Sequence, residues 1–158
     1  MRRFFHTLKA HLMYFFLGRV PIGIKYGIIL HLRYATKEAS CMDICCTSDT
    51  TIYPGDIKIV DLGFACDIPK GFELRVYLRS SMGKQGLVIP NSVGIIDSDY
   101  RGNIHLILGN ISNKPIELNI GERIAQMGVY KVTRISLYET DTLTETERGK
   151  GGLGSTGK

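Results

Sequence analysis

The chain has 158 residues, of which 44% are hydrophobic, and it carries a formal net charge of +5. This length suits one domain with a single hydrophobic core. The charge is confined to one end, because residues 1–37 hold seven Lys/Arg and no acid, whereas the remaining residues hold 13 Lys/Arg against 15 Asp/Glu. The near-neutral body excludes a broad nucleic-acid-binding surface, so any binding of a polyanion must be local.

The basic N-terminal segment is amphipathic over residues 2–17, where apolar residues suit one face of a helix. Its uninterrupted apolar run is shorter than the roughly 20 residues that a membrane-spanning helix needs, and no signal-peptide cleavage site follows cleanly. We interpret residues 1–21 as a basic amphipathic or disordered extension that makes no membrane contact. Organelle targeting by residues 1–20 stays open, since the charge has the right sign but serines are few.

From residue 22 onward the pattern is that of strands separated by turns. Apolar or alternating runs at residues 57–62, 74–78, 104–108 and 116–120 adjoin turns rich in Gly, Pro or Asp. Strands at this spacing indicate an all-β sandwich or barrel. No convincing helical period follows residue 37, and there are no internal repeats.

The four cysteines are Cys41, Cys45, Cys46 and Cys66. They form no C-x-x-C pair, and the four histidines show no zinc-like spacing. We therefore predict free thiols and no structural metal, in the reducing environment of the cytoplasm.

Four polar clusters interrupt the strands, and each is ambiguous alone. The first places Asp43 before a strand-like run, where it could equally be a turn acid. Residues 79–81 follow a strand with a guanidinium and two hydroxyls, which suit phosphate oxygens but also an ordinary polar loop. Residues 121–126 predict a turn and then a strand, with Gln126 half-buried.

The remaining cluster, residues 91–102, offers a placed carboxylate. A Gly-Ile-Ile strand delivers Asp97 into a hairpin whose return strand is expected near Ile104. A carboxylate held at a strand end can orient and deprotonate a water, and Asn91 has the donor and acceptor that reading a nucleobase edge requires. The alternative is a hairpin turn rich in Asp and Gly, with Tyr100 as a half-buried residue.

Residues 148–158 hold five glycines, three cations and two hydroxyls, with one apolar residue. Such a segment has almost nothing to bury, but its backbone, hydroxyls and cations can wrap a phosphate group. A flexible Gly-rich terminus explains the composition equally well. Residues 152–158 match the first seven positions of a phosphate loop, yet the hydroxyl and helix that must follow are missing, so we reject a P-loop NTPase.

These clusters and the tail, in this order, resemble the five motifs of the trimeric dUTP pyrophosphatases (dUTPases). Residues 97–102, 121–126 and 148–157 are close matches, residues 79–81 a good one, and residues 35–43 a degraded one. The resemblance covers roughly residues 22 to 158, and five ordered motifs are far more specific than any one of them.

The resemblance implies a distorted β jelly roll of the β-clip type, assembled as a homotrimer. Residues 22–140 would form this domain. Residues 141–158 would be a flexible arm that closes over the active site of a neighbour, and each site would use motifs from all three chains. The implied reaction is Mg²⁺-dependent hydrolysis of dUTP to dUMP and pyrophosphate, which keeps uracil out of DNA and supplies dUMP for dTMP synthesis.

The resemblance also implies roles at the nucleoside end of the substrate. Asp97 would activate the water that attacks the α-phosphate and would touch the deoxyribose 3′-OH. Tyr100 would pack under the sugar and leave no room for a 2′-OH. The uracil edge would be read by Asn91, Gly94, Ile95 and Ile96.

At the phosphate end, the resemblance implies that Asp43 organises the Mg²⁺ and its waters. The phosphates would be held by Arg79, Ser80, Ser81 and Gln126. Arg148 would act from the arm like an arginine finger, so that the catalytic set is Asp97, Gln126 and Arg148. The other arm contacts would come from Leu153, Gly154, Ser155 and Thr156.

Two positions depart from the family pattern. Leu153 stands where the arm usually carries an aromatic residue that stacks on uracil, so we predict weaker arm closure and a higher Michaelis constant. Residues 40–42, Ser-Cys-Met, replace the usual small-Gly-aromatic run before the Asp, which affects the local geometry of Asp43.

Two other functions fit the same fold. A dCTP deaminase would need a glutamate near the base as proton shuttle, whereas the sequence of Asp97 followed by Tyr100 favours the hydrolase. A non-catalytic binding or regulatory module could use the basic N-terminal extension to contact a partner.

Overall fold

A computed structural model describes residues 19–27, 32–153 and 155 of the chain. The amphipathic stretch over residues 2–17, and the arm residues Gly154 and Thr156, lie outside these ranges. Within the described ranges, no helix is long and apolar enough to cross a membrane.

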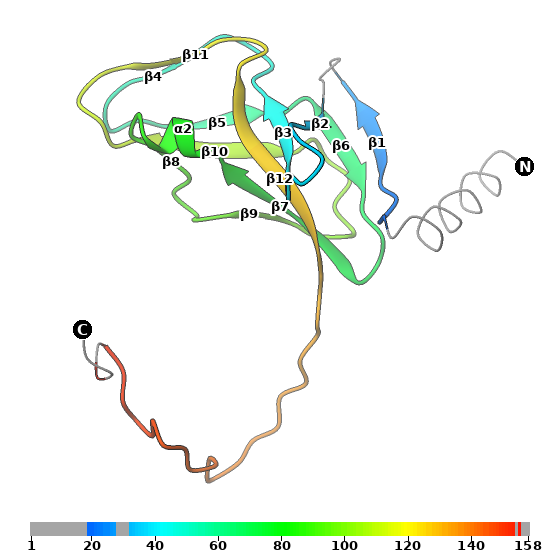
Figure 1. The fold of residues 1–158 in the computed structure, drawn as a ribbon, viewed down its shortest axis with the longest axis vertical. Helices are drawn as coiled ribbons and strands as arrows, with labels where there is room; N and C mark the ends of the chain where they lie inside the picture. Colours follow the sequence, from blue (N-terminus) through cyan, green and yellow to red (C-terminus); the bar gives the residue numbers. More distant parts are fainter. Residues whose placement is uncertain (1–18, 28–31, 154, 156–158) are drawn as a thin grey trace, which may run out of the picture.

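The described chain consists of short strands with one helical turn, α2 (Ser80–Gly83) (Figure 1). The strands are β1 (Gly23–Tyr26), β2 (Arg33–Tyr34), β3 (Met42–Cys45), β4 (Thr50–Ile52), β5 (Ile57–Asp61), β6 (Phe64–Asp67), β7 (Phe72–Leu78), β8 (Leu87–Val88), β9 (Gly94–Ile96), β10 (His105–Asn110), β11 (Ile116–Leu118) and β12 (Arg123–Lys131).

All strand pairs in the described chain are antiparallel, and they form four groups. The largest sheet has the order β2-β3-β12-β7-β9, and a second has the order β5-β10-β8. The other two are the pairs β1-β6 and β11-β4. Figure 1 shows β12 running through the molecule beside β3 and β7, which flank it in the largest sheet. The predicted all-β, jelly-roll-like fold is confirmed.

Alternation along the strands selects the side chains of the core. Leu74 and Val76 of β7 are buried while their neighbours are half-exposed, and Leu106 and Leu108 repeat the pattern on β10. These side chains join one continuous cluster that includes the fully buried Phe64. Burying each large apolar side chain contributes roughly 1.5–3 kcal/mol, so the two main sheets are held together chiefly by this cluster.

One predicted pairing is wrong. The sequence suggested a hairpin from the strand before Asp97 into the strand near Ile104, but β9 pairs with β7 while β10 pairs with β5 and β8. The turn after β9 is closed by a hydrogen bond from the Tyr100 N–H to the Asp97 carbonyl at 3.2 Å. The chain then crosses to another sheet. β9 occupies the edge of β7, and β10 places its buried side chains in the core from the sheet that it forms with β5 and β8.

The polar segment after β7 also differs from the predicted loop, because it contains α2. Met82 in this turn is buried at 4% exposure. The N–H groups of Met82 and Gly83 both donate to the Arg79 carbonyl, at 3.0 and 3.1 Å. The helical turn thus delivers one apolar side chain to the core while its serines face solvent.

After β12 the chain leaves the body of the molecule and runs away from it (Figure 1). Residues 133–150 are all exposed, and four of them are large apolar residues. These are Ile135, Leu137, Tyr138 and Leu143. A single chain therefore leaves an unusual amount of apolar side chain in solvent at this end.

Asn110 at the end of β10 is a buried polar anchor with 2% exposure. Its Nδ2 donates to the carbonyls of Ile52 and Lys114, both at 2.8 Å. Its Oδ1 accepts from the N–H and the hydroxyl of Ser112, at 2.8 and 2.7 Å. One side chain therefore fastens β10 to β4 and to the loop before β11.

We expect Asn110→Ala to lower the free energy of unfolding by roughly 2–4 kcal/mol, because the buried carbonyl of Ile52 and the partly buried carbonyl of Lys114 lose their donor. Urea unfolding at a fixed protein concentration measures the loss. The matched control is Asn113→Ala in the exposed bend nearby, which should change this free energy by less than about 0.5 kcal/mol. Equal losses in the two variants would contradict the anchoring role.

Candidate active site

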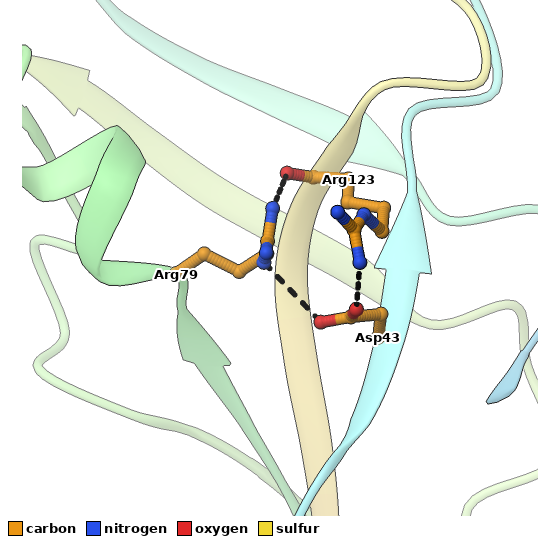
Figure 2. Close-up of polar contacts among 3 residues, drawn as sticks. All are labelled: Asp43, Arg79 and Arg123. Atoms are coloured by element: carbon orange, nitrogen blue, oxygen red, sulfur yellow. Dashed lines mark hydrogen bonds and ion pairs between the residues drawn. The ribbon is translucent and has the colours of Figure 1, made fainter. Parts of the chain in front are cut away.

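A buried carboxylate bridges two arginines where β3, β7 and β12 lie side by side (Figure 2). Asp43 on β3 is only 5% exposed. Its Oδ2 lies 2.9 Å from Nη1 of Arg123, and its Oδ1 lies 3.2 Å from Nε of Arg79. Nη1 of Arg79 also donates to the backbone carbonyl of Arg123 at 3.1 Å. The three residues therefore form one connected unit.

The strand register explains why these side chains meet. Asp43 lies directly opposite Gln126, which lies directly opposite Tyr77, and opposed residues share one face of a sheet. Regular alternation would send Arg123 to the other face, because it is three residues from Gln126. A register shift between Arg123 and Ala125 inserts one residue and turns Arg123 back toward Asp43.

This unit carries a net positive charge, since one carboxylate faces two guanidinium groups. Arg79 uses Nε and Nη1, so its Nη2 has no hydrogen-bonding partner among the described residues, and its side chain is 26% exposed. Burial raises the pKa of the neighbouring Cys45 thiol, an effect that the charge of Arg123 partly offsets. A net cation with unused donors at the surface suits an anionic ligand.

Two hydroxyls and an amide lie close to the Asp43–Arg79–Arg123 unit. Ser80 and Ser81 are exposed in α2, directly after Arg79. The Arg79 N–H donates to the Ile124 carbonyl at 3.1 Å, which fixes the start of α2 against β12. Gln126 is half-buried next to Asp43. The structure thus brings together the residues predicted for the phosphates and the metal, and adds Arg123 to them.

Polar contacts fix the loop that carries Asp97 and Tyr100. Nη2 of Arg101 lies 2.7 Å from Oδ1 of Asp67. The Tyr100 hydroxyl donates to the Asn103 carbonyl at 3.0 Å. A Cβ on Gly102 would lie 2.7 Å from Cζ of Tyr100, so this position has to be glycine for the ring to stay where it is.

Asn103 fixes the same loop to β5. Its Nδ2 donates to Oδ2 of Asp61 at 2.9 Å, and the Gly63 N–H donates to Oδ1 of Asp61 at 2.7 Å. Burial alone raises the pKa of Asp61, but the hydrogen bonds from Asn103 and Gly63 outweigh it and lower that pKa. Hydrogen bonds to Asp61 therefore fix the C-terminal end of the loop, while Asp97 and Tyr100 themselves are exposed.

Asp97 does not meet Arg79 within one chain. Ile96 pairs with Leu74 near the start of β7, so the next residue, Asp97, lies near that end. Arg79 lies beyond the opposite end of β7, five residues from Leu74. At about 3.3 Å per residue these residues are separated by roughly 17 Å or more along the sheet. The structure therefore divides the predicted site into two halves.

The predicted base-reading residues lie beside the Asp97 half. Asn91 is exposed in the turn between β8 and β9, where its Nδ2 donates to the Val93 carbonyl at 3.4 Å. β9 is an edge strand, so one set of backbone groups on Gly94, Ile95 and Ile96 has no partner strand within the described chain. Such a row of donors and acceptors can pair with a planar polar ligand.

The described arm residues lie apart from both halves. Nε of Arg148 donates to the Gly151 carbonyl at 2.9 Å, and the Ser155 N–H donates to the Gly152 carbonyl at 3.0 Å. Leu153 is fully exposed with a φ of 50°, a left-handed conformation that a leucine rarely adopts. No hydrogen bond links these residues to the other candidate residues that the structure describes.

The described residues do not form a metal cage of their own, since no group of three or more His, Cys, Asp or Glu among them could hold an ion. Both oxygens of Asp43 already pair with arginines, which neutralise its charge. Each oxygen keeps a lone pair that can accept from a water. The residues present fit an ion carried mainly by a ligand's phosphates, as Mg²⁺ commonly is.

Sequence reasoning missed Arg123, because a strand residue next to the predicted turn gave no sign of pointing toward Asp43. The one available signal in the sequence is the pair of consecutive apolar residues Ile124 and Ala125, which breaks the alternation and indicates a bulge. The prediction of free cysteines is confirmed for all four.

Comparison with known proteins identifies the family. The dUTPase family model matches residues 27–157. The chain is 43% identical over 126 residues to the deoxyuridine 5′-triphosphate nucleotidohydrolase of Nautilia profundicola, covering 79% of this chain and 89% of that relative. It is 40% identical over 145 residues to the enzyme of the same name from Rickettsia prowazekii, covering 90% of each chain. The chain belongs to the dUTPase family.

Solved structures share its fold. A variant of the dUTPase of Staphylococcus bacteriophage 80alpha, solved with dUpNHpp, matches with a TM-score of 0.81 and 20% identity over 89% of this chain and 100% of that one. A variant of the dUTPase of phage phi11 of S. aureus, in which a structural Mg(II) ion is coordinated, matches with a TM-score of 0.70 and 16% identity over 77% and 97%. At this identity the likeness establishes the fold alone.

Proposed function

We propose that this protein hydrolyses dUTP to dUMP and pyrophosphate. The observation that carries the proposal is that the match to the dUTPase family spans every candidate site residue from Asp43 to Thr156. The geometry supports it, because the Asp43–Arg79–Arg123 unit offers charge and donors to phosphates. Phosphoryl transfer depends mainly on positioning and charge neutralisation, which this arrangement can supply. The reaction keeps uracil out of DNA and supplies dUMP for dTMP synthesis.

The phosphate half of the site binds the leaving pyrophosphate. Arg79 presents its free Nη2 to phosphate oxygens, and the hydroxyls of Ser80 and Ser81 add donors beside it. Gln126 contributes its amide from the neighbouring strand. Asp43 would help to hold a Mg²⁺ ion carried by the triphosphate by accepting hydrogen bonds from the ion's waters, and the ion would supply charge neutralisation for the phosphates.

The nucleoside half carries the base and the nucleophile. Asp97 orients a water toward the α-phosphate and takes its proton as the new P–O bond forms, while the bond from the α-phosphorus to the bridging oxygen breaks and pyrophosphate leaves with that oxygen. Tyr100 packs beneath the deoxyribose, where it excludes a 2′-OH. Asn91 and the free edge of residues 94–96 pair with the uracil edge.

A homotrimer resolves the separation of these two halves. Asp97 and Arg79 lie at opposite ends of β7, so a complete site needs Asp97 from one copy and Arg79 from another. The exposed C-terminal segment has the length to reach a neighbouring copy, and Arg148, Leu153 and Ser155 on it then close the site. Closure excludes water and adds a cation to the phosphates.

The cellular setting follows from the chemistry of the chain. We place the protein in the cytoplasm, because all four thiols are free, as they are in a reducing compartment. A fusion of residues 1–20 to a fluorescent protein would reveal organelle targeting if that segment provides it.

The function is tested by pyrophosphate release from dUTP, dTTP, dCTP and UTP, with and without Mg²⁺. We expect Mg²⁺-dependent release from dUTP alone, and a loss of at least about 100-fold in Asp97→Asn, whose amide cannot take the proton. Ammonia release from dCTP would indicate a deaminase instead. No turnover of any nucleotide would leave a binding module on the dUTPase fold.

Assembly of the site from different copies is tested by mixing inactive chains. Asp97→Asn and Arg79→Ala should each be inactive alone. Co-expressed in equal amounts, they should regain about a quarter of wild-type activity, because that share of interfaces pairs an intact Asp97 with an intact Arg79. Activity no higher than that of the single variants would contradict a shared site.

The substitution in the arm predicts a gain from Leu153→Phe. A ring stacked on uracil is worth roughly 0.5–1.5 kcal/mol by analogy with aromatic pairs, so the Michaelis constant for dUTP should fall about 2- to 10-fold. Steady-state kinetics measure this, with Leu143→Phe outside the motif as the control. An unchanged Michaelis constant in Leu153→Phe would show that the base is covered in another way.

A further inference from the structure

Arg123 is the one member of the charged unit to which neither motif reasoning nor the comparisons give a role. It touches its partners in two ways: its guanidinium pairs with Oδ2 of Asp43, and its carbonyl accepts from Nη1 of Arg79 (Figure 2). It lies on β12, whereas Asp43 comes from β3 and Arg79 follows β7. Arg123 therefore contacts both the buried anion and Arg79, whose side chain is 26% exposed.

The carboxylate would behave differently without this arginine. Asp43 is 5% exposed and needs compensation for both oxygens. Arg79 is the other guanidinium within reach, and a guanidinium can grip both oxygens of a carboxylate at once. With Arg123 absent, Asp43 would draw Arg79 into such a two-point pair. The donors that now face outward would be consumed, and the net charge of the unit would fall from +1 to zero.

We propose that Arg123 is a positioning residue: by occupying one oxygen of Asp43 and holding Arg79 through its carbonyl, it keeps the outer donors of Arg79 free for the phosphates of the substrate. This inference rests on the proposed function, because it concerns the phosphate half of the same site. Under this inference Asp43 also acts as the negative charge that attracts Arg79, and Arg123 weakens that attraction by pairing with the same carboxylate.

The chain offers a matched control for the charge alone. Arg33 on β2 lies directly opposite Asp43 and so points to the same face, yet it forms no ion pair with any described residue. It is exposed, so its field is screened by salt. Arg33→Met removes one positive charge from this region and leaves the ion pairs of Asp43 intact. Arg123→Met removes one positive charge and also the ion pair between Arg123 and Asp43.

The experiment measures binding of inorganic pyrophosphate and of dUpNHpp by calorimetry without Mg²⁺. We expect Arg123→Met to weaken both roughly ten-fold, and Arg33→Met to weaken them by less than about two-fold, because losing a charge-assisted contact costs far more than losing a screened charge. The decisive variant is Asp43→Asn combined with Arg123→Met. It should recover most of the loss, since a neutral amide no longer captures Arg79.

Two results overturn the inference. One is an equal loss in Arg33→Met and Arg123→Met, which would reduce the effect to general charge. The other is a failure of Asp43→Asn to restore binding in the Arg123→Met background, which would show that Arg123 only supports the local fold.

Failure of the proposed function is distinguishable from both. Wild-type protein that releases no pyrophosphate from dUTP, yet shows this binding pattern, retains the Arg123 mechanism at an anion site of another kind. Wild-type protein that turns over dUTP but gives either overturning result retains the function and loses the mechanism.

Discussion

The phosphate half of this protein depends on the burial of one carboxylate. An ionised side chain at 5% exposure is tolerated only with charged partners and hydrogen bonds, so Asp43 dictates where Arg79 and Arg123 lie. Since the two arginines outnumber the acid, the pairing leaves a surplus of positive charge facing outward. The site is therefore organised before any ligand arrives, which reduces the reorganisation that binding would otherwise require.

A second constraint is the length of β7. The strand joins the arginine unit at one end to the Asp97 loop beside the other, and its rigidity keeps these groups apart. A single chain can therefore be well folded and still lack a complete site. In the proposed function, catalysis depends on assembly, because the carboxylate proposed to activate water and the cations proposed to hold phosphates would come from different copies.

Local patterns in the sequence predicted most strands and half of the site. Alternation bounded by turns located β5 and β7, although only β7 buries its alternate apolar residues, since Ile57 and Ile59 of β5 are exposed. The partner of β9 could not be deduced, since pairing is decided by which sheet edge is free and not by nearness in the chain. The role of Arg123 was hidden for a related reason. A one-residue bulge reverses the face on which Arg123 lies, and in the sequence only the consecutive apolar residues Ile124 and Ala125 hint at it.

The distribution of charge also separates a nucleotide from a nucleic acid as the ligand. A protein that follows a nucleic-acid backbone needs cations spread along a surface, whereas residues 38–158 carry slightly more acids than bases. Net positive charge is found instead at two places. One is the unit in which Arg79 and Arg123 pair with the buried Asp43, and the other is the exposed segment that carries Arg148 and Lys150. Two such points cannot track a polymer, but they suit a triphosphate if the segment closes over the sheet as proposed. The proposed closure would matter for binding, because the net charge of +1 in the sheet would otherwise face a ligand that carries several negative charges.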